Sequence, residues 1–236
     1  RRKEAVSGGL GTAMPVIVSR AHDAIIEDID GNRIIDLGAG IGVVNVGNAA
    51  PRVVARVIEA AQAFTHTNFT TAPYLGYIEV CEVLNRITPG THKKKSILQN
   101  SGAEAVETAI KIARKWGYEK KQVAENQAQI IVCEQNFHGR TTTIVSFSSD
   151  SDASTNFGPF TPGFIRIPYD DIDALEKALQ TENVAGFLVE PIQGEAGVML
   201  PDPGYLKKAA DLCKKHRVLF IADEIQTGLG RTGAWL

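Results

Sequence analysis

The stretch Val218-Leu219-Phe220-Ile221-Ala222-Asp223-Glu224-Ile225-Gln226-Thr227-Gly228 decides the fold class of this chain. Its first half is a short apolar run, which predicts a strand buried on both faces of a sheet. The run ends in Asp223, and a carboxylate at the mouth of a buried strand is unfavourable unless it has a partner. The stretch therefore predicts a parallel sheet with functional side chains at the strand ends.

The rest of the chain repeats this pattern, because short apolar runs alternate with stretches of helical periodicity. Strands are predicted at residues 96–99, 129–133, 164–167, 184–189 and 218–222. Helices are predicted at residues 52–64, 77–87, 103–116, 172–180 and 203–216. Such alternation predicts an α/β fold with a mostly parallel sheet that helices cover on both faces.

The N-terminal part has a different pattern. Residues 24–29 and 33–37 flank Asp30-Gly31-Asn32, which predicts an antiparallel hairpin. The passage Gly38-Ala39-Gly40-Ile41-Gly42 allows close backbone approach but is no GxGxxG motif, so it predicts no dinucleotide site.

The composition excludes several classes of function. A net charge of -2 gives no electrostatic reason to expect nucleic acid or a membrane as a partner. Cys81, Cys133 and Cys213 form no CxxC pair, so we expect buried thiols rather than a disulfide framework or a zinc site. The sequence shows no stretch of transmembrane length and no hydrophobic signal core after Arg1. We therefore expect a reducing, cytoplasmic setting. An organelle matrix is the alternative, because the sequence begins without an initiator Met.

The strand ends carry side chains with more than one interpretation. Ser101-Gly102-Ala103 opens a predicted helix, where free amides bind phosphate. Taken alone, however, this motif favours a plain N-cap, formed by Ser101 or Asn100. Asp223 could pair with a pyridinium nitrogen, form a structural ion pair, or bind a metal together with Glu224. The metal alternative is weakened because no His or third carboxylate lies nearby in the sequence.

Five more strand-end residues have alternative interpretations. Phe137 is placed to stack on a flat ring or to join the core, and the neighbouring His138 is more typical of a structural residue. Arg140 offers a planar fork for a carboxylate or forms a surface ion pair. The pair Glu190 and Glu195 also suggests glycoside hydrolysis, a mechanism that leaves the phosphate cradle and Arg140 unexplained.

These strand-end strings resemble those of the class III aminotransferases, which belong to the fold-type-I family of pyridoxal-phosphate enzymes. The resemblance runs from about the predicted hairpin to Leu236. It rests on four ordered strings: Asn100-Ser101-Gly102-Ala103-Glu104-Ala105-Val106-Glu107, Asn136-Phe137-His138-Gly139-Arg140-Thr141, Glu190-Pro191-Ile192-Gln193-Gly194-Glu195 and Leu219-Phe220-Ile221-Ala222-Asp223-Glu224-Ile225-Gln226-Thr227-Gly228. It implies an incomplete large domain at residues 49–236 and an N-terminal segment, residues 1–48, whose hairpin belongs to the small domain.

The resemblance also implies how the cofactor, pyridoxal 5'-phosphate, is held. Ser101, Gly102 and Ala103 would bind its phosphate. Phe137 and Ile225 would lie on opposite faces of the ring. Asp223 would keep the ring nitrogen protonated, and Gln226 would bond the ring hydroxyl with Glu190 close by.

The same resemblance implies the substrates. Arg140 would hold a substrate carboxylate, and Glu195 would pair with a second, downstream arginine. Residues 7–84 look like 4-aminobutyrate aminotransferases, whereas residues 115–235 look more like ornithine aminotransferases. Ornithine enzymes typically carry tyrosine where Ile41 stands, and an apolar side chain cannot bond an α-amino group. We therefore expect an ω-amino acid as donor, 4-aminobutyrate ahead of ornithine, with 2-oxoglutarate as acceptor.

One expected residue is missing from the sequence. The resemblance implies a Schiff-base lysine roughly thirty residues after Asp223, yet only residues 224–236 follow it, and none is a lysine. We expect these 236 residues to be inactive alone, and a full-length homodimer in amino-acid metabolism to be the active form. The alternative is a non-catalytic, truncated paralogue that serves as a binding or assembly scaffold.

Overall fold

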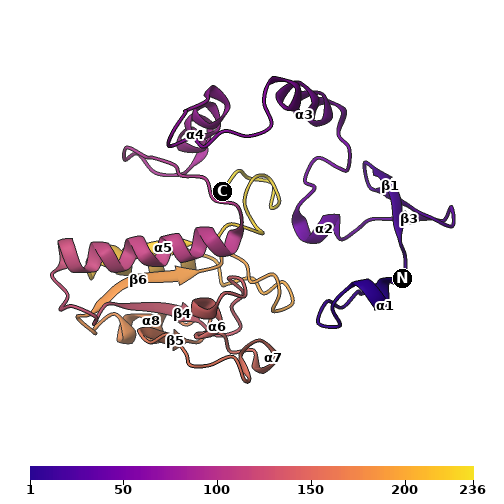
Figure 1. Cartoon of the computed structure of the whole chain (residues 1–236). Coiled ribbons are helices and arrows are strands. Elements are labelled where there is room, and N and C mark those ends of the chain that lie inside the picture. Colours follow the sequence, from indigo (N-terminus) through magenta and orange to yellow (C-terminus); the bar gives the residue numbers. More distant parts are fainter. The chain divides into compact units, whose positions relative to one another are not determined.

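The computed structural model describes residues 1–236 and divides into two compact units, Arg1–Tyr74 and Leu75–Leu236. Figure 1 shows the elements of both units along the chain. The expected division near residue 48, between parts of a small and a large domain, stays a prediction.

Unit Arg1–Tyr74 contains a three-stranded antiparallel sheet in the order β1-β2-β3. Its strands are β1 (Val18–His22), β2 (Ile25–Asp28) and β3 (Arg33–Ile35), and its helices are α1 (Arg2–Ala5), α2 (Ala39–Gly42) and α3 (Pro51–Ala63). The predicted hairpin is confirmed as β2 and β3, and β1 is a strand that the sequence pattern did not reveal. The Asp28 carboxylate closes the turn by accepting from the amides of Asp30 (3.0 Å) and Asn32 (2.8 Å).

Unit Leu75–Leu236 is built on a parallel sheet in the order β5-β4-β6-β7. Its strands are β4 (Gln129–Cys133), β5 (Phe164–Ile167), β6 (Val184–Val189) and β7 (Leu219–Ala222), and all three pairings are parallel. Every residue of β6 is buried. That burial explains why its sequence is a continuous apolar run instead of an alternating one.

The strand predicted at residues 96–99 is wrong. This segment forms no ladder, and Ile97 is exposed. Side chains of α4 (Leu75–Ile87) meet its backbone instead: the Tyr77 hydroxyl accepts from the Leu98 amide at 2.9 Å, and the Cys81 thiol lies 3.7 Å from the Ser96 carbonyl oxygen. An apolar run becomes a strand only where a neighbouring strand supplies its hydrogen bonds.

Helices cover both faces of the parallel sheet, as predicted. The long helix α5 (Gly102–Trp116) packs on one face, through Val106, Ile110 and Ala113. Helices α8 (Ile172–Ala178) and α9 (Tyr205–Lys215) pack on the other. The remaining elements are a π-helical turn (Gly117–Lys121), α6 (Thr142–Val145) and α7 (Ser151–Ser154).

The three cysteines are free thiols. Cys133 and Cys213 are buried in the core, as expected, whereas Cys81 is only half-buried. None of the helices combines the length and the apolar character needed to cross a bilayer.

Candidate active site

The carboxyl ends of β4, β6 and β7 meet the start of α5 around one cavity of about 210 Å³. It is lined by Gly102, Ala103, Phe137, His138, Gly139, Glu190, Ile192, Asp223, Ile225, Gln226 and Thr227. These residues come from four separate parts of the chain. Parallel strands place their carboxyl ends on the same edge of a sheet, and ligands of open α/β sheets bind there.

Asp223 follows the last residue of β7 and is buried, but it is not alone. One carboxylate oxygen, Oδ2, lies 2.6 Å from Nδ1 of His138, and the other, Oδ1, accepts from the Ile225 amide at 3.1 Å. The His138 side chain is fully buried. The second ring nitrogen, Nε2, has no partner. The contact with the Asp223 carboxylate therefore involves one ring nitrogen, and the other is a buried polar atom without a partner.

The contact between His138 and Asp223 was not predicted from the sequence. A structural role was expected for His138, with no contact to Asp223. The only available signal was its position at a strand end, since the two residues lie far apart in the chain. The His138 imidazole gives the buried Asp223 carboxyl group a hydrogen-bond partner, which offsets part of the cost of its burial.

Glu190 is the second carboxyl group of this cavity, directly after β6. It is buried, and its Oε2 accepts from the Phe137 amide at 3.0 Å. Burial raises the pKa of Glu190 from 4.5 to about 7; His138 and the Phe137 amide oppose this rise, and the Asp223 charge adds to it. Near neutral pH this group therefore exchanges its proton readily, whereas a surface glutamate is fully ionised.

The start of α5 is an N-capped helix terminus with free amides. The Ser101 hydroxyl oxygen accepts from the Glu104 amide at 3.2 Å, and the Glu104 carboxylate accepts from the Asn100 amide at 2.8 Å. The amides of Gly102 and Ala103 have no acceptor within the protein. The N-cap alternative for Ser101 is thus confirmed, and two first-turn donors remain for an anion.

Two glycines bring the loops close to this helix start. A Cβ at Gly102 would lie 3.0 Å from Cγ2 of Ile225. Gly139 has a φ of 122°, and a Cβ there would lie 2.7 Å from that of Ala103. The cavity wall therefore depends on the absence of side chains at these positions.

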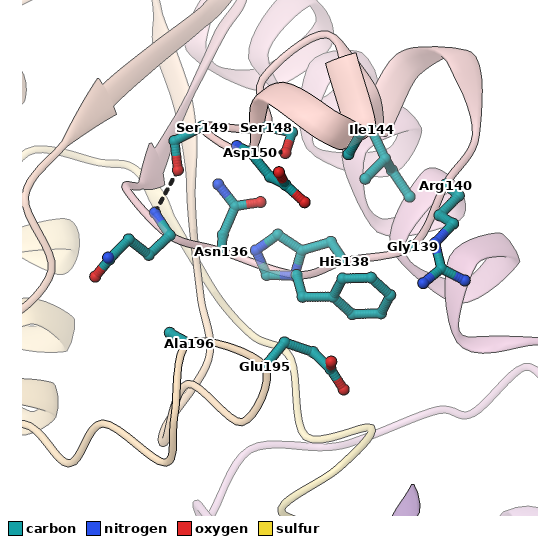
Figure 2. A pocket seen from close by; sticks show the side chains of 13 residues that line it. Asn136, His138, Gly139, Arg140, Ile144, Ser148, Ser149, Asp150, Glu195 and Ala196 are labelled. Atoms are coloured by element: carbon teal, nitrogen blue, oxygen red, sulfur yellow. Dashed lines mark hydrogen bonds between the residues drawn. The ribbon is translucent and has the colours of Figure 1, made fainter. Parts of the chain in front are cut away.

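A second cavity of about 360 Å³ adjoins the first, since Phe137, His138 and Gly139 line both. In Figure 2, Ser148, Ser149 and Asp150 lie on one side of His138, and Glu195 and Ala196 lie on the other. The exposed Arg140 also lines this cavity, and its guanidinium carbon lies 5.4 Å from the centre of the Phe137 ring. This contact holds the arginine in a cation–π arrangement at the cavity rim.

Glu195 and Gln226 link the two cavities. The Gln226 amide nitrogen, Nε2, donates to Oε1 of Glu195 at 3.0 Å. Gln226 lines the first cavity and Glu195 the second. The carboxylate of Glu195 is therefore already oriented toward the first cavity by a residue of that cavity.

The structure brings together most of the predicted site residues. Seven line the first cavity: Gly102, Ala103, Phe137, Glu190, Asp223, Ile225 and Gln226. Arg140 and Glu195 line the second cavity, and Ser101 caps α5. Ile41 belongs to unit Arg1–Tyr74 and is exposed, so its expected place at the substrate stays a prediction. The individual roles of the other residues also stay predictions.

Comparison with known proteins defines the class. The family described as "Aminotransferase class-III" matches residues 8–236. This chain therefore belongs to the class III aminotransferases, which depend on pyridoxal phosphate.

Individual relatives carry two different names. The chain is 44% identical to a 4-aminobutyrate aminotransferase of Mycobacterium tuberculosis over 257 aligned residues, which cover 99% of this chain and 56% of that protein. It is 48% identical to an ornithine aminotransferase of Bacillus cereus over 223 residues, which cover 93% of this chain and 54% of that protein. The chain thus spans about half the length of the curated relatives it matches.

Solved structures confirm the fold class. One similar structure is that of an ornithine aminotransferase of Toxoplasma gondii, described with partial occupancy of PLP at its active site. It has a TM-score of 0.88 and 43% sequence identity, and the match covers 100% of this chain and 54% of that protein. An acetylornithine aminotransferase of Elizabethkingia anophelis has a TM-score of 0.79 and 46% identity, with 100% and 56% covered. The parallel sheet belongs to the fold-type-I aminotransferase fold, as predicted.

Proposed function

We propose that the protein carrying this chain transfers the amino group of an ω-amino acid to 2-oxoglutarate. The favoured amino donor is 4-aminobutyrate. The observation that carries the proposal is the buried Asp223 carboxylate, held by His138 at 2.6 Å, in the same cavity as the free amides of Gly102 and Ala103. The carboxyl group suits a protonated ring nitrogen, and the free amides suit a phosphate. Pyridoxal phosphate has both groups.

The chain's own residues fit this cofactor in charge as well as in position. Bound pyridoxal phosphate supplies an electron sink for negative charge at the substrate carbon. Asp223 would hold the proton of the ring nitrogen, and its carboxyl group is oriented by the His138 ring and the Ile225 amide. Phe137 and Ile225 would flank the ring, and Gln226 would bond its hydroxyl.

Glu190 completes the proposed cofactor site. Its carboxyl group faces the same cavity and fixes the Phe137 amide. With a pKa of about 7, Glu190 can accept or release a proton near neutral pH without leaving a full second negative charge beside Asp223. We propose that it adjusts its proton to the charge state of the bound ring.

The second cavity is the proposed substrate site. Arg140, held over the Phe137 ring, would bind a substrate carboxylate with its planar fork. Glu195, which the Gln226 amide holds at 3.0 Å, would act as the gate that admits the second carboxylate of 2-oxoglutarate. Both residues lie beside the proposed ring site and not within it.

The choice of donor rests on Ile41. Its side chain has no donor or acceptor for an α-amino group, which favours 4-aminobutyrate over ornithine. Ornithine is the second candidate, because relatives of 46% and 48% identity carry that name. A purely non-catalytic scaffold is not favoured, since such a protein would not need Asp223, Arg140, Glu195 and Gln226 together around two adjoining cavities.

No lysine follows Asp223 among these residues, so we expect the 236 residues alone not to turn over substrate. The active form is proposed to be a homodimer. Three free thiols are consistent with a reducing, cytoplasmic compartment.

Steady-state kinetics of the protein in its natural length test the donor. With 2-oxoglutarate as acceptor, kcat/KM is expected to be higher for 4-aminobutyrate than for ornithine. The variant Ile41→Tyr is expected to move the ratio toward ornithine, because the hydroxyl offers a hydrogen bond to a polar group. A wild-type protein that prefers ornithine would overturn the proposed donor while leaving transamination intact.

A further inference from the structure

Tyr169 lies outside both cavities yet contacts the backbone that carries Glu190. It follows β5, two residues after Ile167. Its hydroxyl lies 3.1 Å from the carbonyl oxygen of Glu190 and 3.0 Å from that of Pro191. Both acceptors belong to the segment that leaves β6 and enters the site. A single hydroxyl proton is therefore shared between two consecutive carbonyl groups.

The Tyr169 ring packs against a second aromatic ring of the core. It meets the ring of Tyr205, on α9, edge to face with centroids 6.0 Å apart. Tyr205 is buried. Burial raises the pKa of Tyr169, so its hydroxyl keeps its proton and remains a donor throughout the physiological pH range. The position of this donor is thus set by the core between the sheet and α9.

The contacts continue into the first cavity. The Glu190 backbone that Tyr169 holds bears the carboxyl group that accepts from the Phe137 amide at 3.0 Å. Glu190 and Phe137 both line the cavity, whereas Tyr169 does not. The half-buried Tyr169, which packs against the core, is connected in this way to two site residues that follow different strands.

From these contacts we infer that Tyr169 is a positioning residue of the cofactor site: its hydroxyl holds the Glu190–Pro191 backbone, and through the Glu190 carboxyl it holds Phe137. This inference rests on the proposed function, because the ligand it affects is pyridoxal phosphate. Tyr169 touches neither the proposed cofactor nor the substrate. It acts only through the backbone at the end of β6.

Two matched substitutions test the inference in the protein of natural length. Tyr169→Phe removes only the hydroxyl and keeps the ring on Tyr205. Tyr205→Phe is the control, since it makes the same chemical change in the neighbouring ring, whose hydroxyl makes no hydrogen bond to the Glu190–Pro191 backbone. A general loss of core stability would appear in both variants, and a positioning role only in the first.

Two quantities are measured for each variant. The first is deuterium exchange of the peptide that contains Phe137, in the cofactor-free protein. The second is the dissociation constant of pyridoxal phosphate. Tyr169→Phe is expected to speed the exchange and to raise the dissociation constant about fivefold, the effect of losing one neutral hydrogen bond. Tyr205→Phe is expected to change both less than about twofold.

Equal changes in the two variants, or none in Tyr169→Phe, overturn the inference. If the wild-type protein fails to bind pyridoxal phosphate, the proposed function fails. The exchange comparison still decides whether Tyr169 holds Glu190 and Phe137, because it needs no cofactor.

Discussion

Replacing Glu190 by glutamine should make the cofactor-free protein more stable at alkaline pH. The carboxyl group is buried, and its pKa rises from 4.5 to about 7 on folding. That rise corresponds to about 3 kcal/mol, since a tenfold change in proton affinity is worth about 1.4 kcal/mol. Glutamine keeps an oxygen for the Phe137 amide but cannot ionise, so it removes this cost without removing the contact.

The direction of the pH dependence follows from the proton affinities of the Glu190 carboxyl group in the folded and the unfolded chain. Below pH 4.5 the carboxyl group is protonated in both the folded and the unfolded chain, so its ionisation contributes nothing. Between pH 4.5 and about 7 the unfolded chain loses the proton while the folded chain keeps it, which stabilises the unfolded state. Above about pH 7 the full cost applies. The advantage of Glu190→Gln should therefore grow from near zero at low pH to about 3 kcal/mol at pH 8.

Urea denaturation of the cofactor-free wild type and variant at a series of pH values from 4.5 to 8 measures this difference. Glu125→Gln is the matched control at an exposed side chain, and its effect is expected to be small at every pH in the series. A difference that stays constant with pH, or a variant that becomes less stable than wild type as pH rises, would refute the reasoning about Glu190.

Three other substitutions have defined outcomes in the protein of natural length. Asp223→Asn removes the charge proposed to hold the ring proton, and it should lower kcat by a factor of about 10² to 10³ in the steady-state assay. Arg140→Lys keeps the charge but loses the planar fork, so the KM of the amino donor should rise about tenfold with a smaller change in kcat. Gly139→Ala places a Cβ 2.7 Å from that of Ala103 at a φ of 122°. Thermal denaturation should show a loss of about 2 kcal/mol or more, and cofactor affinity should fall as the helix start is displaced.

The elements that could be predicted are those whose pattern is set by burial. The apolar runs of β4, β5, β6 and β7 are strands because each has a neighbour in the sheet. The equally apolar segment at residues 96–99 is not a strand, because the hydroxyl of Tyr77 accepts the hydrogen bond of the Leu98 amide instead. Strand β1 was missed because apolar and polar residues do not alternate clearly along Val18–His22, so the sequence shows no apolar strand face.

The location of the site could be predicted from the sequence, but the contacts between its residues could not. Polar residues after the strands indicated the correct edge of the sheet, since the topology of parallel strands brings those ends together. The contact between His138 and Asp223 could not be predicted, because nothing local in either segment specifies a partner so far away in the chain. The same holds for Tyr169, which bonds only backbone carbonyls at the end of another strand.

A crystal structure of the natural-length protein with pyridoxal phosphate is the most direct test of the proposed site. The cofactor phosphate is expected within about 3 Å of the amides of Gly102 and Ala103, and the ring nitrogen within about 3 Å of an Asp223 oxygen. His138 should still bond the same carboxylate. A phosphate bound away from the start of α5, or a ring nitrogen that points away from Asp223, would contradict the proposed cofactor site.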